Sequence, residues 1–228
     1  KSNHDLRSNG KYIVMPKDWV EPDNWDGTLT TTPIATSETA FTSPVLGKVN
    51  LNLGGGTFGY VYGGGNSASV PSTDVTIYGA FDIGYAFGGG NGSKPVKNSA
   101  GTWVANGGAM VTGNAKISAR GGRIGQVFGG SDAKGDILGS STADIKTTED
   151  QECTLILTRL FGAGNEADVN GDVNLILSGC TSDNVQFVHG GSYNAHITGD
   201  VNLTITSGFY TNVFGGNDAR GSIGGNIN

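Results

Sequence analysis

The sequence predicts an all-β protein built from stacked, similar coils, and three observations lead to this prediction. A short motif, in which an apolar residue is followed by an aromatic residue and glycines, recurs along the chain. Alternating apolar and polar residues precede each copy, which is typical of a strand with one buried face. The 228 residues include 40 glycines without a G-X-Y period, and only 15% of the residues are charged. Such a composition favours many tight turns and short strands.

Residues 1–46 lie outside the repeat, and we expect them to form a cap or lead-in segment. They contain Trp19 and Trp25 and a Thr/Ser-rich run from Thr28 to Ser43. Residues 12–15 are apolar enough to form a strand. A stack of coils exposes the core of its terminal coil, so a segment that covers it is expected. A small separate domain is the alternative, although 46 residues without disulfides would bury little core.

The repeat region is predicted to cover residues 47–228, and each coil is predicted to open with a strand. In every opening the second residue is polar and the third is aliphatic, so one face is buried and the other meets water. The openings begin at Val49, Val75, Ala115, Ala143, Val173 and Val201. These starts give coils of 26–30 residues, with one longer interval of 40.

The glycine motif is predicted to end a second strand in each coil. Its copies begin at Val61, Ala86, Val127, Leu160, Val188 and Val213. The next position forms an aromatic column: Tyr62, Phe87, Phe128, Phe161, His189 and Phe214. We expect this column to be buried, with His189 as a half-exposed substitute for Phe; an exposed platform for sugars is the alternative. The glycines then form a turn where side chains do not fit or φ is positive.

A lone aliphatic residue follows each turn and predicts a third, very short strand. It recurs at Val70, Ile137, Val169, Ile197 and Ile223. Three short strands per coil, stacked on their equivalents, predict a right-handed parallel β-helix (a β-solenoid) of about six coils. One long insertion, about residues 92–113 with Lys94, Lys97 and Trp103, should project from a corner. Residues 225–228 match the opening of a seventh coil, so we expect the natural protein to continue beyond them.

Two columns of polar residues at the turns are candidates for calcium binding. The first follows the glycine motif at Asn66, Asn91, Asp132, Asn165, Tyr193 and Asp218. Most of these residues are neutral and they do not repeat every nine residues, so a hydrogen-bonded ladder is favoured over a metal site. The second column comprises Asp74, Asp172 and Asp200, just before the first strand. Solvated carboxylates are expected there, and a cation between Asp172 and Asp200 is the alternative.

The two cysteines, Cys153 and Cys180, precede their motifs by similar distances in consecutive coils. They are therefore predicted to occupy the same corner one layer apart, at a spacing that a disulfide accepts. Either a disulfide or two stacked free thiols fits this arrangement. A disulfide would indicate a location outside the cytoplasm.

The sequence predicts no catalytic, cofactor-binding or metal-binding residues. Triad and HExxH spacings are absent, and His4 and His196 have no visible partner. The nearest charged grouping is Asp132, Lys134 and Asp136, which a repeated turn explains. A net charge of −6 argues against nucleic-acid binding. No apolar run is long enough to cross a membrane.

Runs such as GDVNLTITSGFYTNVFGG and VNLNLGGGTFGYVYGGG resemble the glycine-rich β-helix repeats of large secreted or surface proteins of gut anaerobes, broadly adhesin-like. The resemblance covers residues 47–228. It implies a non-enzymatic extracellular segment, a rigid stalk or binding surface of a larger bacterial surface protein. Its partners would be host or bacterial surface glycans or proteins, bound at the Trp103-bearing insertion or the cysteine corner. A polysaccharide-active β-helix enzyme or a carbohydrate-binding module is the alternative.

Overall fold

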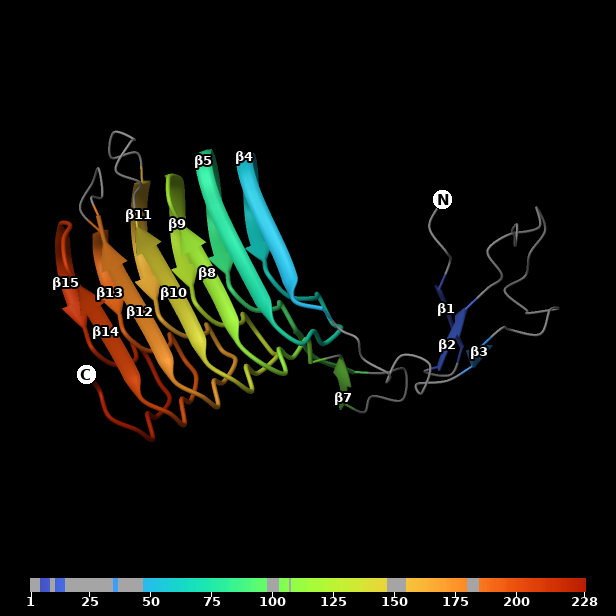
Figure 1. Ribbon diagram of the computed structural model, residues 1–228. Helices are drawn as coiled ribbons and strands as arrows, with labels where there is room; N and C mark the ends of the chain where they lie inside the picture. Colours follow the sequence, from blue (N-terminus) through green and yellow to red (C-terminus); the bar gives the residue numbers. More distant parts are fainter. Residues whose placement is uncertain are drawn as a thin grey trace. The chain divides into compact units, whose positions relative to one another are not determined.

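The computed structural model describes residues 5–8, 11–14, 35–36, 47–97, 103–106, 108–146, 155–179 and 185–228. The chain divides into two compact units, Lys1–Leu46 and Gly47–Asn228. All regular structure in the described residues is β-strand, so the predicted all-β class is confirmed (Figure 1). The first unit contains a three-stranded antiparallel sheet of β1 (Asp5–Ser8), β2 (Lys11–Val14) and β3 (Ala35–Thr36). The strand predicted at residues 12–15 corresponds to β2.

The second unit is built from parallel strands that pair with their equivalents in the neighbouring repeats. It begins with two long strands, β4 (Val49–Tyr62) and β5 (Thr73–Phe87). Each later repeat has two shorter ones: β8 (Ala115–Ala119) and β9 (Gly122–Phe128), β10 (Ser141–Lys146) and β11 (Leu155–Phe161), β12 (Val173–Ser178) and β13 (Val185–His189), and β14 (Val201–Ile205) and β15 (Tyr210–Phe214).

These strands form two ladders that meet in β4 and β5. The first ladder comprises the first halves of β4 and β5 with β8, β10, β12 and β14, and the second comprises their second halves with β9, β11, β13 and β15. Every pairing in both ladders is parallel, for example Val173 with Val201 and Val188 with Val213. Figure 1 shows the two ladders running side by side through the unit. The predicted stacking of parallel strands on their equivalents is therefore confirmed.

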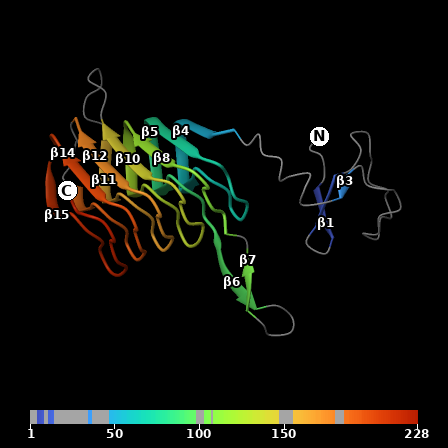
Figure 2. The same ribbon diagram turned by 60° about the horizontal axis from the view of Figure 1, so that its bottom comes forward.

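A third column of single parallel bridges lies between the end of one repeat and the start of the next. It links the predicted aliphatic residues and one more, Val111, which bridges Val70 and Ile137. Residues 108–113 thus belong to the repeat. The inserted part contains an antiparallel hairpin of β6 (Ser93–Lys97) and β7 (Trp103–Asn106), which extends away from the ladders in Figure 2. Ile227 bridges Val201, so residues 225–228 do align with the opening of β14.

The main core lies between the inward faces of the two ladders. Its largest members are fully buried aliphatic side chains such as Ile77, Ile117, Leu157, Leu175 and Leu177. A second cluster joins the third column to the first residues of the first ladder, including Val169, Val173 and Val201. Because every second residue of a strand points inward and these residues are mostly apolar, each strand contributes to a core that continues from repeat to repeat.

The predicted openings of two coils are wrong by two residues. Val49 pairs with Thr73, and Ala115 pairs with Ser141, so Thr73 and Ser141 open their strands and Val75 and Ala143 stand third. Both polar residues are buried, and their hydroxyls donate to carbonyl oxygens of Gly88 and Gly162 at 2.6 and 2.8 Å. A buried hydroxyl is tolerated when it is hydrogen-bonded. The predicted inward and outward faces still hold, because a shift of two residues keeps every side chain on its face.

Candidate functional site

The aromatic column forms a continuous stack of rings along the second ladder. Successive centroids from Tyr62 to Phe214 lie 5.1, 4.8, 4.6, 5.0 and 4.9 Å apart with nearly parallel planes. Phe87, Phe128 and Phe161 are at most 2% exposed, which confirms the predicted buried column for these residues. The Tyr62 hydroxyl donates to Asp132 Oδ2 at 3.0 Å. Burial, with Asp132 as the second cause, raises the pKa of Tyr62 far above its ordinary value.

His189 occupies this stack between Phe161 and Phe214. The prediction of a half-exposed side chain is wrong, because His189 is only 3% exposed. Neither ring nitrogen has a hydrogen-bond partner among the described residues. Asp218 Oδ2 lies 3.8 Å from Nε2. Burial lowers the pKa of His189, and the neighbouring Asp218 only partly opposes this effect.

The first glycine of the motif is required by close packing along the stack rather than by its backbone angle. A Cβ at Gly129 would collide with the carbonyl oxygen of Gly162, and one at Gly162 would collide with that of Gly190. The same contact recurs from Gly63 to Gly88 and from Gly190 to Gly215. Of the two predicted reasons for glycine in this turn, lack of space is therefore the one that applies.

The polar residues after the motif hydrogen-bond to one another along the stack. Asn91 Nδ2 donates to Asn66 Oδ1 at 2.7 Å, and Asn165 Nδ2 donates to Asp132 Oδ1 at 2.8 Å. This supports the predicted ladder of side chains. Within the described ranges, no group of three or more His, Cys, Asp or Glu side chains could hold a metal ion.

Carboxylates that precede the first ladder bind backbone N–H groups of the next repeat. Asp172 Oδ1 accepts from the Asp200 amide at 2.9 Å, and Asp200 Oδ1 accepts from the Asn226 amide at 2.7 Å. Asp136 and Asp168 do the same before the third column, towards the amides of Asp168 and His196. Asp172 and Asp200 therefore have backbone partners, where solvated carboxylates were expected and a cation between them was the alternative.

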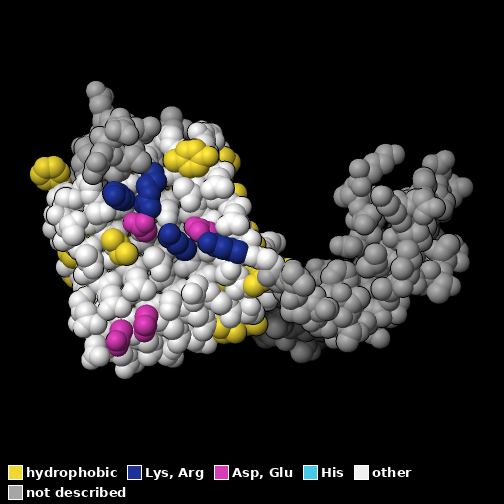
Figure 3. Space-filling view, in the orientation of Figure 1, with side chains coloured by type: hydrophobic (Ala, Val, Ile, Leu, Met, Phe, Trp, Pro, Cys, Tyr) yellow, Lys and Arg dark blue, Asp and Glu magenta, His cyan; other side chains and the backbone are white. Residues whose placement is uncertain are grey.

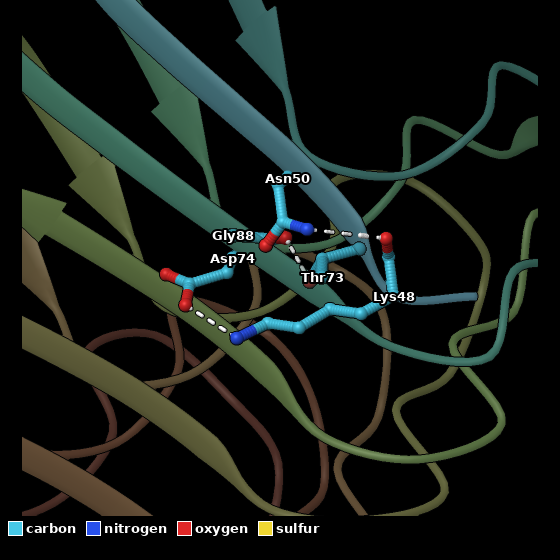
Figure 4. Close-up of polar contacts among 5 residues, drawn as sticks. All are labelled: Lys48, Asn50, Thr73, Asp74 and Gly88. Atoms are coloured by element: carbon cyan, nitrogen blue, oxygen red, sulfur yellow. Dashed lines mark hydrogen bonds and ion pairs between the residues drawn. The ribbon is translucent and has the colours of Figure 1, made fainter.

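Asp74 does not belong to that column, and this prediction is wrong. The two-residue error in the opening of its coil placed it before the strand, whereas it pairs in register with Asn50 inside the first ladder. Its carboxylate forms an ion pair with Lys48, in which Nζ lies 2.5 Å from Oδ2 (Figure 4). Asp74 is thus part of the outward face of the first ladder.

The outward face of the first ladder carries several charged side chains on and beside its strands. A second ion pair there joins Arg120 Nη2 and Asp144 Oδ2 at 2.5 Å, and Arg120 Nη1 also donates to the Asp144 carbonyl oxygen at 2.7 Å. Lys116 and Lys146 lie on the same face, on β8 and β10. Figure 3 shows Lys and Arg side chains gathered there around acidic ones. Beyond them, Asn174, Asn202 and Asn228 form a ladder with bonds of 3.1 and 2.9 Å.

The outward face of the second ladder carries aromatic side chains that sequence analysis did not single out. The rings of Tyr60 and Tyr85 stack at 4.9 Å, and Tyr60 is 58% exposed. Arg159 lies 4.9 Å from the ring centroid of Phe187. The period-two pattern marks these positions as outward, on a face that also carries the charged pair Asp82 and Arg123 on adjacent strands.

Several predicted site residues remain separate or lie outside the described residues. Asp132 and Asp136 each hydrogen-bond to their own partner in the stack, so the grouping with Lys134 is explained by repeated turns. Cys153 and Cys180 lie outside the described residues, as do the side chains of Lys94, Lys97 and Trp103.

Comparisons with protein-family models, with curated proteins and with solved structures gave no match for this chain. The part of the chain that the structure describes contains no helix with the length and hydropathy needed to span a bilayer.

Proposed function

We propose that this chain is a non-enzymatic extracellular segment of a larger bacterial surface protein, in which it serves as a rigid stalk or binding surface. The proposal rests on one observation: the polar side chains at the turns form hydrogen bonds with neighbouring repeats. Turn carboxylates and amides bind the next repeat along the stack, as Asp172 does with the Asp200 amide. Glycoside hydrolysis instead requires two carboxyl groups that face one bond. Turn side chains that hydrogen-bond to neighbouring repeats support a structural role.

The architecture proposed for the second unit is a right-handed parallel β-helix with three short strands in each of about six coils. The three sets of stacked pairs, two ladders and one column of bridges, support three strands per coil. Crossovers between parallel strands are right-handed in about 98% of cases, which supports this hand. In such a coil every backbone group of a strand bonds to the repeat above or below, so the stack resists bending as one body.

A location outside the cell rests on the resemblance of the repeat to those of secreted and surface proteins. Host or bacterial surface glycans or proteins are the proposed partners, with the β6–β7 hairpin and the cysteine corner as candidate contact regions. Segments that project from a rigid scaffold commonly carry binding residues, which supports the choice of these regions. The net charge of −6 disfavours nucleic acid as the partner.

The stalk proposal is tested by a distance measurement across the stack. Spin labels are attached at Asn52 and Thr204, outward residues of β4 and β14, in the full chain with Cys153 and Cys180 replaced by serine. Register places these sites five strand steps apart. A rigid stack predicts one narrow distance distribution between the label-bearing backbones near 24 Å, from about 4.8 Å per step. A broad distribution would contradict a rigid stalk.

The non-enzymatic part of the proposal has its own assay. The full chain is incubated with neutral and acidic polysaccharides, and new reducing ends and unsaturated products are measured. We expect neither product above the level of a heat-unfolded sample. Product formation that is lost on unfolding would instead favour the polysaccharide-active enzyme.

A further inference from the structure

Charge is distributed unevenly over the second unit. The outward face of the first ladder carries four cations, Lys48, Lys116, Arg120 and Lys146, and two carboxylates, Asp74 and Asp144. We call this set the cationic face. Its net charge is +2, whereas the whole chain has a net charge of −6. Most acidic residues of the later repeats lie instead at the turns: Asp132, Asp136, Glu166, Asp168, Asp172, Asp200 and Asp218.

The two carboxylates of the cationic face are already neutralised. Lys48 Nζ lies 2.5 Å from Asp74, and Arg120 holds both the carboxylate and the carbonyl oxygen of Asp144. Among the described residues, Lys116 and Lys146 have no ion-pair partner. Within the described ranges, the two lysines are therefore the cations of this face that no carboxylate neutralises.

The register also brings like charges together. Ala119 pairs with Ile145, so the next residues, Arg120 and Lys146, are neighbours on adjacent strands. Like charges at such a spacing destabilise a sheet. Lys116 pairs with Thr142, four residues before Lys146, so the backbones that bear the two lysines lie about 14 Å apart. An anionic chain bound at Lys146 would reach Lys116 along the same surface.

We propose that the cationic face binds a linear anionic polysaccharide, and this inference rests on the proposed role as a surface segment. Charge complementarity selects the occupant. The chain's net charge of −6 disfavours a nucleic acid as the anionic partner. The row of Lys116 continues along the stack into Asn174, Asn202 and Asn228. Each amide retains hydrogen-bonding capacity beyond its ladder bond and can meet sugar hydroxyls.

The test uses the full chain and a defined probe, an oligomer of polygalacturonate, at low ionic strength. Binding is measured by calorimetry for the wild type and for the double variant Lys116→Gln/Lys146→Gln. The control is Lys134→Gln/Arg220→Gln, which removes the same net charge from exposed turn residues. We expect roughly tenfold weaker binding for the first variant and less than about twofold for the control. Binding of the wild type should weaken as salt is added.

Three results would overturn the proposal. The first is no measurable binding of polygalacturonate by the wild type, and the second is equal weakening in both double variants. The third is tighter binding of single-stranded oligo(dT) than of polygalacturonate, which would indicate a nucleic-acid partner. Circular dichroism of each variant checks that the fold is retained. A rigid stack in the spin-label experiment together with any of these results would leave the stalk role intact and remove only the ligand.

Discussion

At the scale of single residues, His189 differs most in chemistry from the column in which it lies. Its position in the aromatic stack could be predicted from the repeat, but its burial could not. A polar side chain suggests exposure, yet His189 stacks between Phe161 and Phe214 and is only 3% exposed. Its two nitrogens lack hydrogen-bond partners among the described residues, so protonation would place an imidazolium where water is excluded.

The lowered pKa of His189 predicts a loss of stability in mild acid. The unfolded chain binds the proton near pH 6.5, whereas the folded chain resists it. The free energy of unfolding should therefore fall as the pH drops below about 6.5, by up to about 1.4 kcal/mol per pH unit until the folded form is also protonated. Urea unfolding at pH 7.5, 6.0 and 5.0 measures this slope. In His189→Phe the slope should be smaller, and an unchanged slope would show that other groups cause it.

The turn carboxylates are predicted to stabilise the stack through single backbone bonds. Asp172→Ala removes the acceptor of the Asp200 amide and should lower the free energy of unfolding by about 1–2 kcal/mol. Asp74→Ala is the matched control, because it removes a surface ion pair worth about 0.5 kcal/mol. Denaturant unfolding compares the two variants. Equal losses of stability in the two variants would show that the hydrogen bond from the Asp200 amide to Asp172 stabilises the fold no more than a surface ion pair does.

At the scale of elements, the pattern of apolar residues predicts the strands and their faces well. It does not determine register where a polar residue takes a buried position. Thr73 and Ser141 stand where other repeats have Val or Ala, and their hydrogen bonds to Gly88 and Gly162 become apparent only in the structure. Val111 could not be predicted for a different reason: a hairpin separates it from the motif that marks its repeat. The charged neighbours on the cationic face depend on this register, so they could not be predicted either.

The first glycine of each motif is predicted to limit how closely the repeats stack. Gly129→Ala would drive a methyl group into the carbonyl oxygen of Gly162, and the backbone cannot move without breaking the ladders on both sides. We expect a loss of at least about 2 kcal/mol in the free energy of unfolding. Gly59→Ala is the control, because its added methyl group meets nothing within 4 Å. A loss for Gly129→Ala as small as that of the control would refute the close-packing explanation.

At the scale of the whole second unit, stability is collective. Each repeat contributes only short strands, and its backbone groups and core side chains are completed by the repeats on either side. The sequence could predict this organisation because the motif, the strand pattern and the spacing all repeat. It could not predict a ligand, because residues that bind an external partner need not recur from coil to coil.

The most direct test of the account is the removal of one complete repeat. Residues 171–175 and 199–203 have the same sequence, so deleting residues 173–200 joins Asp172 to Val201 and leaves the local sequence unchanged. If the repeats are equivalent, β10 then pairs with β14 and Phe161 stacks on Phe214. We predict that this variant folds cooperatively with the β-sheet circular dichroism of the parent. Deleting only residues 173–186 should unfold the following repeats, because it removes a first-ladder strand and breaks the register. Unfolding of both variants alike would contradict the stacked-repeat architecture.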